Sequence, residues 1–235
     1  MTALPPDSLF SGDDGAADPI LVRRLGDYRA GTGDLAAVVG AFETSRVFVA
    51  VVAVAVETGQ SSLTGLTSDR NAEMSLVMID GPAGHKTLPV FSDLAALSRW
   101  SEQARPVPVE ARRAALSGVD EGCDLIVIDP GGPVRAVLPR PAVWAVAQGR
   151  SWQPSWADPA VREAVLNRVR AVAGVSGASC EAGSRAELRV VVQVVAGLDR
   201  SGLDTVTGAV SQALAAEELV AERVDSIELT LRAAS

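Results

Sequence analysis

Two short apolar segments, each followed by capping or turn residues, constrain the fold of this chain more than any other feature. Leu88 to Phe91 is the first, and Ser92 after it can cap a helix that runs to Trp100. The second, Asp124 to Ile128, ends in the turn sequence Asp129-Pro-Gly-Gly-Pro133. Apolar runs of this length predict strands that are buried on both faces. We therefore expect them to lie at the centre of a β-sheet that helices cover.

Composition divides the 235 residues into three parts. Residues 1–33 are acidic and rich in Pro and Gly, which predicts a solvated leader with a short helix near Pro19 to Tyr28. Residues 34–150 alternate apolar strands with short helices, and residues 57–71 predict a polar loop among them. Residues 151–235 have an apolar pattern of their own. We expect an α+β fold, in which two α+β domains, 34–150 and the smaller 151–235, are each a mixed β-sheet packed with helices.

The second domain predicts the element order α-β-β-α-β. Asp158 followed by Pro159 is a strong helix start, and Leu188 to Val195 predicts a strand. Leu203 to Leu214 has the spacing of an amphipathic helix. The last strand alternates between two faces, with Ile227, Leu229 and Leu231 on one and Ser226, Glu228, Thr230 and Arg232 on the other.

The net charge of −8 does not point to a polyanionic partner. The first 150 residues hold 13 basic and 18 acidic residues, and the remainder hold 8 and 11, so neither half is basic. A phosphate backbone is bound by clustered basic side chains. No nucleic acid partner is therefore expected.

The chain has features typical of a cytoplasmic protein. Its first residues contain neither the basic region nor the apolar region of a signal peptide. The longest apolar run, Val47 to Val56, has ten residues, which is about half of what a membrane-spanning helix needs. Cys123 and Cys180 are too few for a disulfide framework and are interpreted as ordinary thiols. We expect no membrane contact, no metal and no cofactor.

Four segments together resemble one protein family. They are Leu88-Pro-Val-Phe-Ser-Asp-Leu94, Trp100, Pro106-Val-Pro-Val109 and Asp124 to Pro133, and they resemble the SseB family of the enhanced-serine-sensitivity type. Residues 34–148 look like its N-terminal domain, and the α-β-β-α-β part is similar to its smaller C-terminal domain. The acidic leader resembles that of actinobacterial members. Many members have Asn-Pro where this chain has Asp129-Pro130. The resemblance implies no catalytic residues, because the family has none established.

A catalytic interpretation of the motif can be formulated from the residues themselves. His85 is the only histidine, so a Ser-His-Asp arrangement has one base available. Ser92 and Asp93 lie nearby in sequence, and the turn after Asp129 can offer backbone N–H groups to an anion. Both prolines of that turn lack an N–H, however. The plainer interpretation gives Ser92, Asp93 and Asp129 structural roles at a helix start and a strand end.

Five of the nine aromatic residues fall between positions 91 and 156. Phe91, Trp100 and Trp144 fit core positions. Trp152 and Trp156 lie among Pro and Ser at the domain boundary. They either pack the two domains together or lie at a partner surface, where a large rigid ring adds contact area.

The sequence therefore predicts a non-enzymatic interaction or regulatory protein that binds an unknown protein partner or itself. The candidate ligand or partner residues are Phe91, Ser92, Asp93, Asp129, Trp152 and Trp156. The alternative is a small-ligand-binding protein or weak enzyme with a cleft near residues 85–93 and 129–133. A third hypothesis is a homodimer formed at a sheet edge, either Val190 to Val195 or Ile227 to Leu231.

Overall fold

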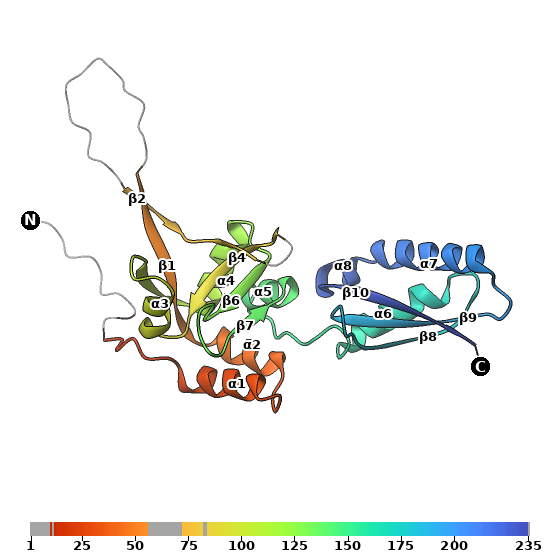
Figure 1. Cartoon of the computed structure of the whole chain (residues 1–235), viewed down its shortest axis with the longest axis horizontal. Coiled ribbons are helices and arrows are strands. Elements are labelled where there is room, and N and C mark those ends of the chain that lie inside the picture. Colours follow the sequence, from red (N-terminus) through yellow and green to blue (C-terminus); the bar gives the residue numbers. More distant parts are fainter. Residues whose placement is uncertain (1–9, 11, 56–71, 82–83, 235) are drawn as a thin grey trace, which may run out of the picture. The chain divides into compact units, whose positions relative to one another are not determined.

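The computed structural model describes residue 10 and residues 12–55, 72–81 and 84–234. The predicted loop of residues 57–71 and the first nine residues of the leader lie outside the described residues. The chain divides into an N-terminal unit, residues 1–139 and 143–150, and a C-terminal unit, residues 140–142 and 151–235 (Figure 1).

Helices and strands alternate along most of the chain. The helices are α1 (Pro19–Arg29), α2 (Leu35–Glu43), α3 (Leu94–Trp100), α4 (Ala111–Asp120), α5 (Arg140–Ala147), α6 (Pro159–Arg170), α7 (Arg200–Ala215) and α8 (Glu218–Arg223). The strands are β1 (Arg46–Ala55), β2 (Ala72–Leu76), β3 (Ile79–Asp80), β4 (Lys86–Phe91), β5 (Arg105–Glu110), β6 (Leu125–Ile128), β7 (Ala136–Leu138), β8 (Val175–Ala182), β9 (Leu188–Val194) and β10 (Ile227–Ala233).

The N-terminal unit is built on a mixed, seven-stranded sheet. β1 is antiparallel to β2, β4 and β5, and β7 is antiparallel to β6. β4 and β6 run parallel, with Val90 opposite Ile128. The two predicted central strands are therefore neighbours, and their carboxyl ends lie side by side at the same end of the sheet. In sheets with parallel strands, ligands commonly bind beyond these carboxyl ends.

Helices cover both faces of this sheet, as buried strands require. Alternation along β4 directs Leu88 to one face and Phe91 to the other. Gly118 of α4 lies against the Leu88 side chain, so α4 covers the first face. Phe91 packs with Phe48 and Leu97 under α3 on the second face. All of these apolar side chains are buried.

The described part of the predicted leader is packed against the N-terminal unit, which corrects the expectation of a solvated arm. α1 starts after Asp18, whose carboxylate accepts the N–H of Leu21 at 3.1 Å. Leu21 and Leu25 are buried. Gly15 is also buried and has a φ of +77°, and a Cβ at this position would overlap the Leu94 side chain. Only glycine combines this backbone conformation with so close an approach.

The C-terminal unit is a three-stranded sheet in the order β10-β9-β8. β9 is antiparallel to β8 and parallel to β10. Val190 to Val194 belong to β9 at the centre of the sheet, so the hypothesis of an edge at Val190 to Val195 is wrong. Ile227 to Leu231 belong to β10, which is an edge strand.

One face of this second sheet is covered by α6 and α7 (Figure 1). The core beneath them comes from every second residue of β9 together with the apolar stripes of the helices: Val161, Val165, Val169, Leu188, Val190, Val192, Val194, Val206, Val210, Leu214, Val220 and Val224. Both units are thus mixed sheets packed with helices, which confirms the predicted α+β class. Every helix in the described part of the chain is too short or too polar to cross a bilayer.

Replacing Leu88 by alanine should destabilise the N-terminal unit by about 2–5 kcal/mol, because the substitution leaves a cavity between α4 and the sheet. Val137 of the edge strand β7 is 38% exposed. Val137→Ala is the matched control and should cost less than about 1 kcal/mol. Urea unfolding of both variants measures the difference, and equal losses would contradict the assignment of β4 to the centre of the core.

Candidate functional site

Ser92 and Asp129, two of the residues predicted to line a cleft, meet where β4 and β6 end. Asp129 follows β6, and its carboxylate accepts two hydrogen bonds from Ser92, the residue after β4. The backbone N–H of Ser92 lies 2.8 Å from Asp129 Oδ1, and the Ser92 hydroxyl lies 2.7 Å from Oδ2. Ser92 is 5% exposed and Asp129 is 8% exposed. The sequence motif therefore brings together a buried pair whose polar groups bind each other.

The Asp129 backbone is held in an uncommon conformation. Its φ is +51°, which is the left-handed region that Asn and Asp tolerate better than most residues. The Asp129 carbonyl accepts the N–H of Gly132 at 2.9 Å, and this bond closes the turn. Burial raises the pKa of the Asp129 carboxyl above its ordinary value, and the two hydrogen bonds from Ser92 only partly oppose that shift.

Arg46 at the start of β1 extends this polar pair toward the leader. Its guanidinium donates to the Ser92 carbonyl at 3.1 Å. It also holds both carboxylate oxygens of Asp13, with Nε 2.6 Å from Oδ2 and Nη2 2.8 Å from Oδ1, and donates to the Ala16 carbonyl. The guanidinium lies over the Phe48 ring, 4.3 Å from its centroid. Leader, β1 and the β4–α3 junction are thus joined by one arginine.

The other residues predicted near this site have structural contacts as well. Phe91 is fully buried, and its ring lies 5.2 Å from that of Trp100. The N-cap of α3 is Asp93 rather than Ser92, because the Asp93 carboxylate accepts the N–H of Ala96 at 2.5 Å. Phe91, Ser92 and Asp129 are therefore too buried to form a partner surface in this structure, which corrects their assignment as surface residues.

His85 precedes β4, whereas Ser92 follows it. His85 pairs with Asp124, and Ser92 pairs with Asp129. The His85 Nδ1 is 3.0 Å from Asp124 Oδ2, and both side chains are about half exposed. Asp124 precedes β6 just as His85 precedes β4, so the pair lies at the amino ends of the two parallel strands. Ser92 lies at their carboxyl ends. The parallel pairing thus separates His85 from Ser92 and does not assemble the triad.

Both cysteines lie where burial disfavours the thiolate form. Burial raises the pKa of both Cys123 and Cys180, and a protonated thiol is a poor nucleophile and metal ligand. The described part of the chain has no group of three or more His, Cys, Asp or Glu residues placed to hold a metal ion.

Residues 151–157, which we call the tryptophan segment, contain the polar atoms that are least well satisfied. Among the described residues, Trp152 Nε1 and Ser155 Oγ are the buried side-chain atoms without a hydrogen-bond partner. Trp156 is 40% exposed. The segment is anchored to the C-terminal unit by Glu187, whose carboxylate accepts the N–H of Ser155 at 2.8 Å and that of Asp225 at 2.9 Å.

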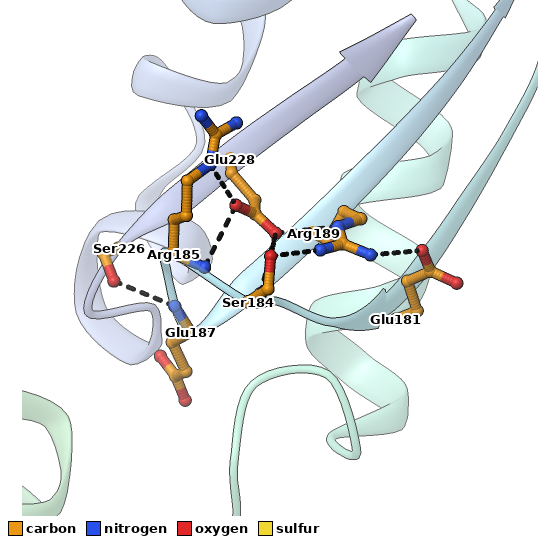
Figure 2. Close-up of polar contacts among 7 residues, drawn as sticks. All are labelled: Glu181, Ser184, Arg185, Glu187, Arg189, Ser226 and Glu228. Carbon is orange, nitrogen blue, oxygen red and sulfur yellow. Dashed lines mark hydrogen bonds and ion pairs between the residues drawn. The ribbon is translucent and has the colours of Figure 1, made fainter. Parts of the chain in front are cut away.

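Glu228 of β10 makes the densest polar network of the C-terminal unit (Figure 2). Its carboxylate binds the β8–β9 hairpin, accepting the backbone N–H of Ser184 at 2.8 Å and that of Arg185 at 3.2 Å. Arg189 donates from Nε to the same carboxylate at 2.7 Å and continues to Glu181 at 3.3 Å. These bonds, led by the one from the Ser184 backbone, lower the pKa of Glu228 to about 2. We call this network the hairpin latch.

Sequence reasoning missed Arg46, Asp13 and the hairpin latch. Arg46 is the first residue of β1, and Asp13 lies in the segment predicted to be solvated. Glu228 was placed on the polar face of its strand, which is correct, but it is 8% exposed. A signal was available for Glu228, because Arg185 in the hairpin turn and Arg189 in β9 are cations that a carboxylate can bind.

The fold is that of a protein with two α+β units. The motif at the ends of β4 and β6 and the hairpin latch both consist of residues that bind other groups of the same chain. The sequence model of the protein family described as SseB protein N-terminal domain matches residues 21–145. The chain therefore belongs to the SseB family. No curated protein and no solved structure matches the chain.

Asp129→Asn should become increasingly stabilising as the pH rises above the ordinary carboxyl pKa of 3.8. The raised pKa means that the folded state binds the proton more tightly than the unfolded state. Wild-type stability therefore falls as the pH rises through that raised pKa, whereas Asn has no charge to bury. The Asn amide can also accept from the Ser92 N–H and donate to its hydroxyl.

Urea unfolding of wild type and Asp129→Asn over a pH series tests this expectation. Asp129→Ala is the control, because it leaves the Ser92 N–H and hydroxyl unpaired and should cost about 1–3 kcal/mol. A stability difference between wild type and Asp129→Asn that does not change with pH would contradict the proposed cost of burying the charge.

Glu228→Gln should destabilise the C-terminal unit at neutral pH and change its acid unfolding. The lowered pKa means that Glu228 contributes stability above its ordinary pKa of 4.5, and that this contribution is lost as the pH falls toward about 2. Between pH 4.5 and about 2, the stability of the variant should decrease less than that of wild type, as measured by circular dichroism during unfolding at each pH. Glu181→Gln, at the exposed end of the same network, is the control and should keep the wild-type profile.

Proposed function

We propose that the protein is a non-enzymatic, cytoplasmic interaction or regulatory protein that binds a protein partner through the tryptophan segment. The observation that carries the proposal is that one short segment contains two buried donors without a partner, Trp152 Nε1 and Ser155 Oγ, and an exposed ring, that of Trp156. A buried donor without a partner costs about 1–3 kcal/mol. A partner that offered a carbonyl or carboxylate to the Trp152 Nε1–H would recover that free energy.

The anchoring of the segment also favours recognition. Glu187 holds the Ser155 backbone, and the Ala157 N–H donates to the Pro154 carbonyl at 2.8 Å, so the chain around Trp156 is shaped before binding. A preorganised aromatic residue loses little conformational entropy when it binds. Exposed tryptophans are frequent among the residues that dominate binding energy at protein interfaces.

The carboxyl ends of β4 and β6 give less support to an enzyme or ligand-binding function. The hydroxyl of Ser92 and both oxygens of Asp129 are engaged with each other, and Arg46 is engaged with Asp13 and two carbonyls. A ligand at this place would have to break bonds that join the leader, β1 and β6. We therefore favour the interaction function over a ligand cleft near residues 85–93 and 129–133.

Two tryptophans of equal exposure allow a matched test. Trp156 is 40% exposed in the tryptophan segment. Trp144 on α5 is 41% exposed, so the expectation of a core position for it was wrong. Trp156→Ala should reduce the recovery of a stoichiometric partner from native lysate by tenfold or more, since loss of a central aromatic anchor costs about 2 kcal/mol or more. Trp144→Ala should leave recovery unchanged.

The partner is identified first, by affinity purification with the wild-type chain and mass spectrometry, and its affinity for each variant is then measured with purified proteins. Thermal unfolding of both variants establishes that they are folded. Equal affinity of the partner for wild type and Trp156→Ala, or recovery of no partner at all, would count against the proposal.

A further inference from the structure

β10 has a free hydrogen-bonding edge. The Leu188 N–H donates to the Ser226 carbonyl, and the Ala234 N–H donates to the Val194 carbonyl. Because the N–H and C=O of one strand residue point to the same side, even-numbered residues of β10 face β9. The odd-numbered residues Ile227, Leu229, Leu231 and Ala233 therefore direct their N–H and C=O groups outward. Within the described residues β10 pairs with β9 alone.

This edge has few of the features that keep sheet edges from pairing. β10 has seven residues and contains no proline, lysine or glycine. The opposite edge strand, β8, has an irregularity between Val175 and Gly177, where its register with β9 shifts. Bulges of that kind prevent edge-to-edge association, and a long regular edge promotes it. β10 is therefore the edge of this sheet that can accept another strand.

A hollow with a mixed lining, in which Arg140, Ser211, Asp225 and Ser226 are the polar members, lies beside the same edge. Its lining includes Leu214 of α7, Val220 and Val224 of α8, and Ile227 and Leu229 of β10. Ile227, Leu229 and Leu231 are only half-buried against the helices. A strand added next to β10 would cover these side chains as well as satisfy the outward N–H and C=O groups.

The sequence of β10 is complementary to itself in one antiparallel register. When two copies are centred on Thr230, Glu228 of one copy lies opposite Arg232 of the other, and Leu229 lies opposite Leu231. Centring on Glu228 or on Arg232 instead places two like charges directly opposite each other, which is unfavourable. Centring on Leu229 or on Leu231 leaves both charged residues opposite uncharged ones. The Glu228 carboxylate already accepts bonds from Ser184, Arg185 and Arg189 of its own chain, so Arg232 of the second copy would join an existing network rather than meet a free carboxylate.

We infer that two copies of this chain pair through β10, antiparallel and centred on Thr230, to form a continuous six-stranded sheet. A two-fold axis through the paired Thr230 residues generates this contact from a single surface. In this register, residues whose backbone N–H and C=O groups point outward lie opposite each other. Leu229 of one copy and Leu231 of the other therefore form two backbone hydrogen bonds across the interface. This inference goes beyond the proposed function and does not depend on the tryptophan segment.

Disulfide cross-linking tests both the contact and its register. In the inferred dimer the two Thr230 residues form a non-hydrogen-bonded pair with Cα atoms about 4.5 Å apart, which is within the range that a disulfide bridges. Thr230→Cys in a Cys180→Ser background should form a covalent dimer under mild oxidation. Ser179→Cys in the same background is the matched control, because Ser179 and Thr230 flank Val191 on the two edge strands of the same sheet. It should stay monomeric on a non-reducing gel.

Cysteine at position 229 or 231 distinguishes the registers. In the inferred register neither residue lies opposite its own copy, so cross-linking there should be much weaker than at 230. Preferential cross-linking at 229 or 231, or no cross-linking at any of the three positions, would overturn the inference.

Sedimentation of the purified full chain provides the second test. Wild type should be dimeric, and Arg232→Glu, which places two carboxylates opposite each other, should weaken the dimer by tenfold or more. Arg200→Glu at the exposed start of α7 makes the same charge change away from β10 and should leave the dimer intact. Monomeric wild type at high concentration would refute the inference. Because no other protein is present, this result is independent of whether a partner is recovered from lysate.

Discussion

The hydrogen bonds between Ser92 and the Asp129 carboxylate hold together the centre of the N-terminal unit. They join the ends of the parallel strands β4 and β6, where the chain turns into α3 and into the 129–133 turn. A buried carboxylate is tolerated only when hydrogen bonds replace its hydration. Arg46 extends this constraint to β1 and, through Asp13, to the leader. Ser92, Asp129 and Arg46 together thus join four segments that are distant in sequence.

The C-terminal unit uses a carboxylate in a related way. Glu228 on β10 binds the backbone of the β8–β9 hairpin, so the edge strand and the hairpin are fixed together. The two carboxylates differ in environment. Burial dominates at Asp129 and raises its pKa, whereas hydrogen bonds and arginines dominate at Glu228 and lower its pKa. Both carboxylates bind groups of the chain itself.

The sequence predicted the elements better than the contacts between them. The strands at 88–91 and 124–128, the helix after Asp158 and the alternation of the last strand were visible as local patterns, because burial and capping depend on nearby residues. The packing of the leader was missed, because a segment rich in Asp and Gly resembles a solvated arm until Arg46 and Leu94 are placed beside it. Likewise, an alternating pattern at 226–232 indicates two faces but cannot reveal that Glu228 is enclosed by a hairpin.

By itself, the sequence determined the α+β class, the two-part organisation and the motif that places the chain in the SseB family. Periodicity, capping and turn chemistry act over a few residues, so they can be read along the chain. Only the tertiary structure decided that Ser92 and Asp129 bind each other, that His85 lies at the other end of the strands, and that β10 rather than β9 is an edge. Those outcomes depend on strand order and direction, which arise from contacts between distant segments and leave no local pattern.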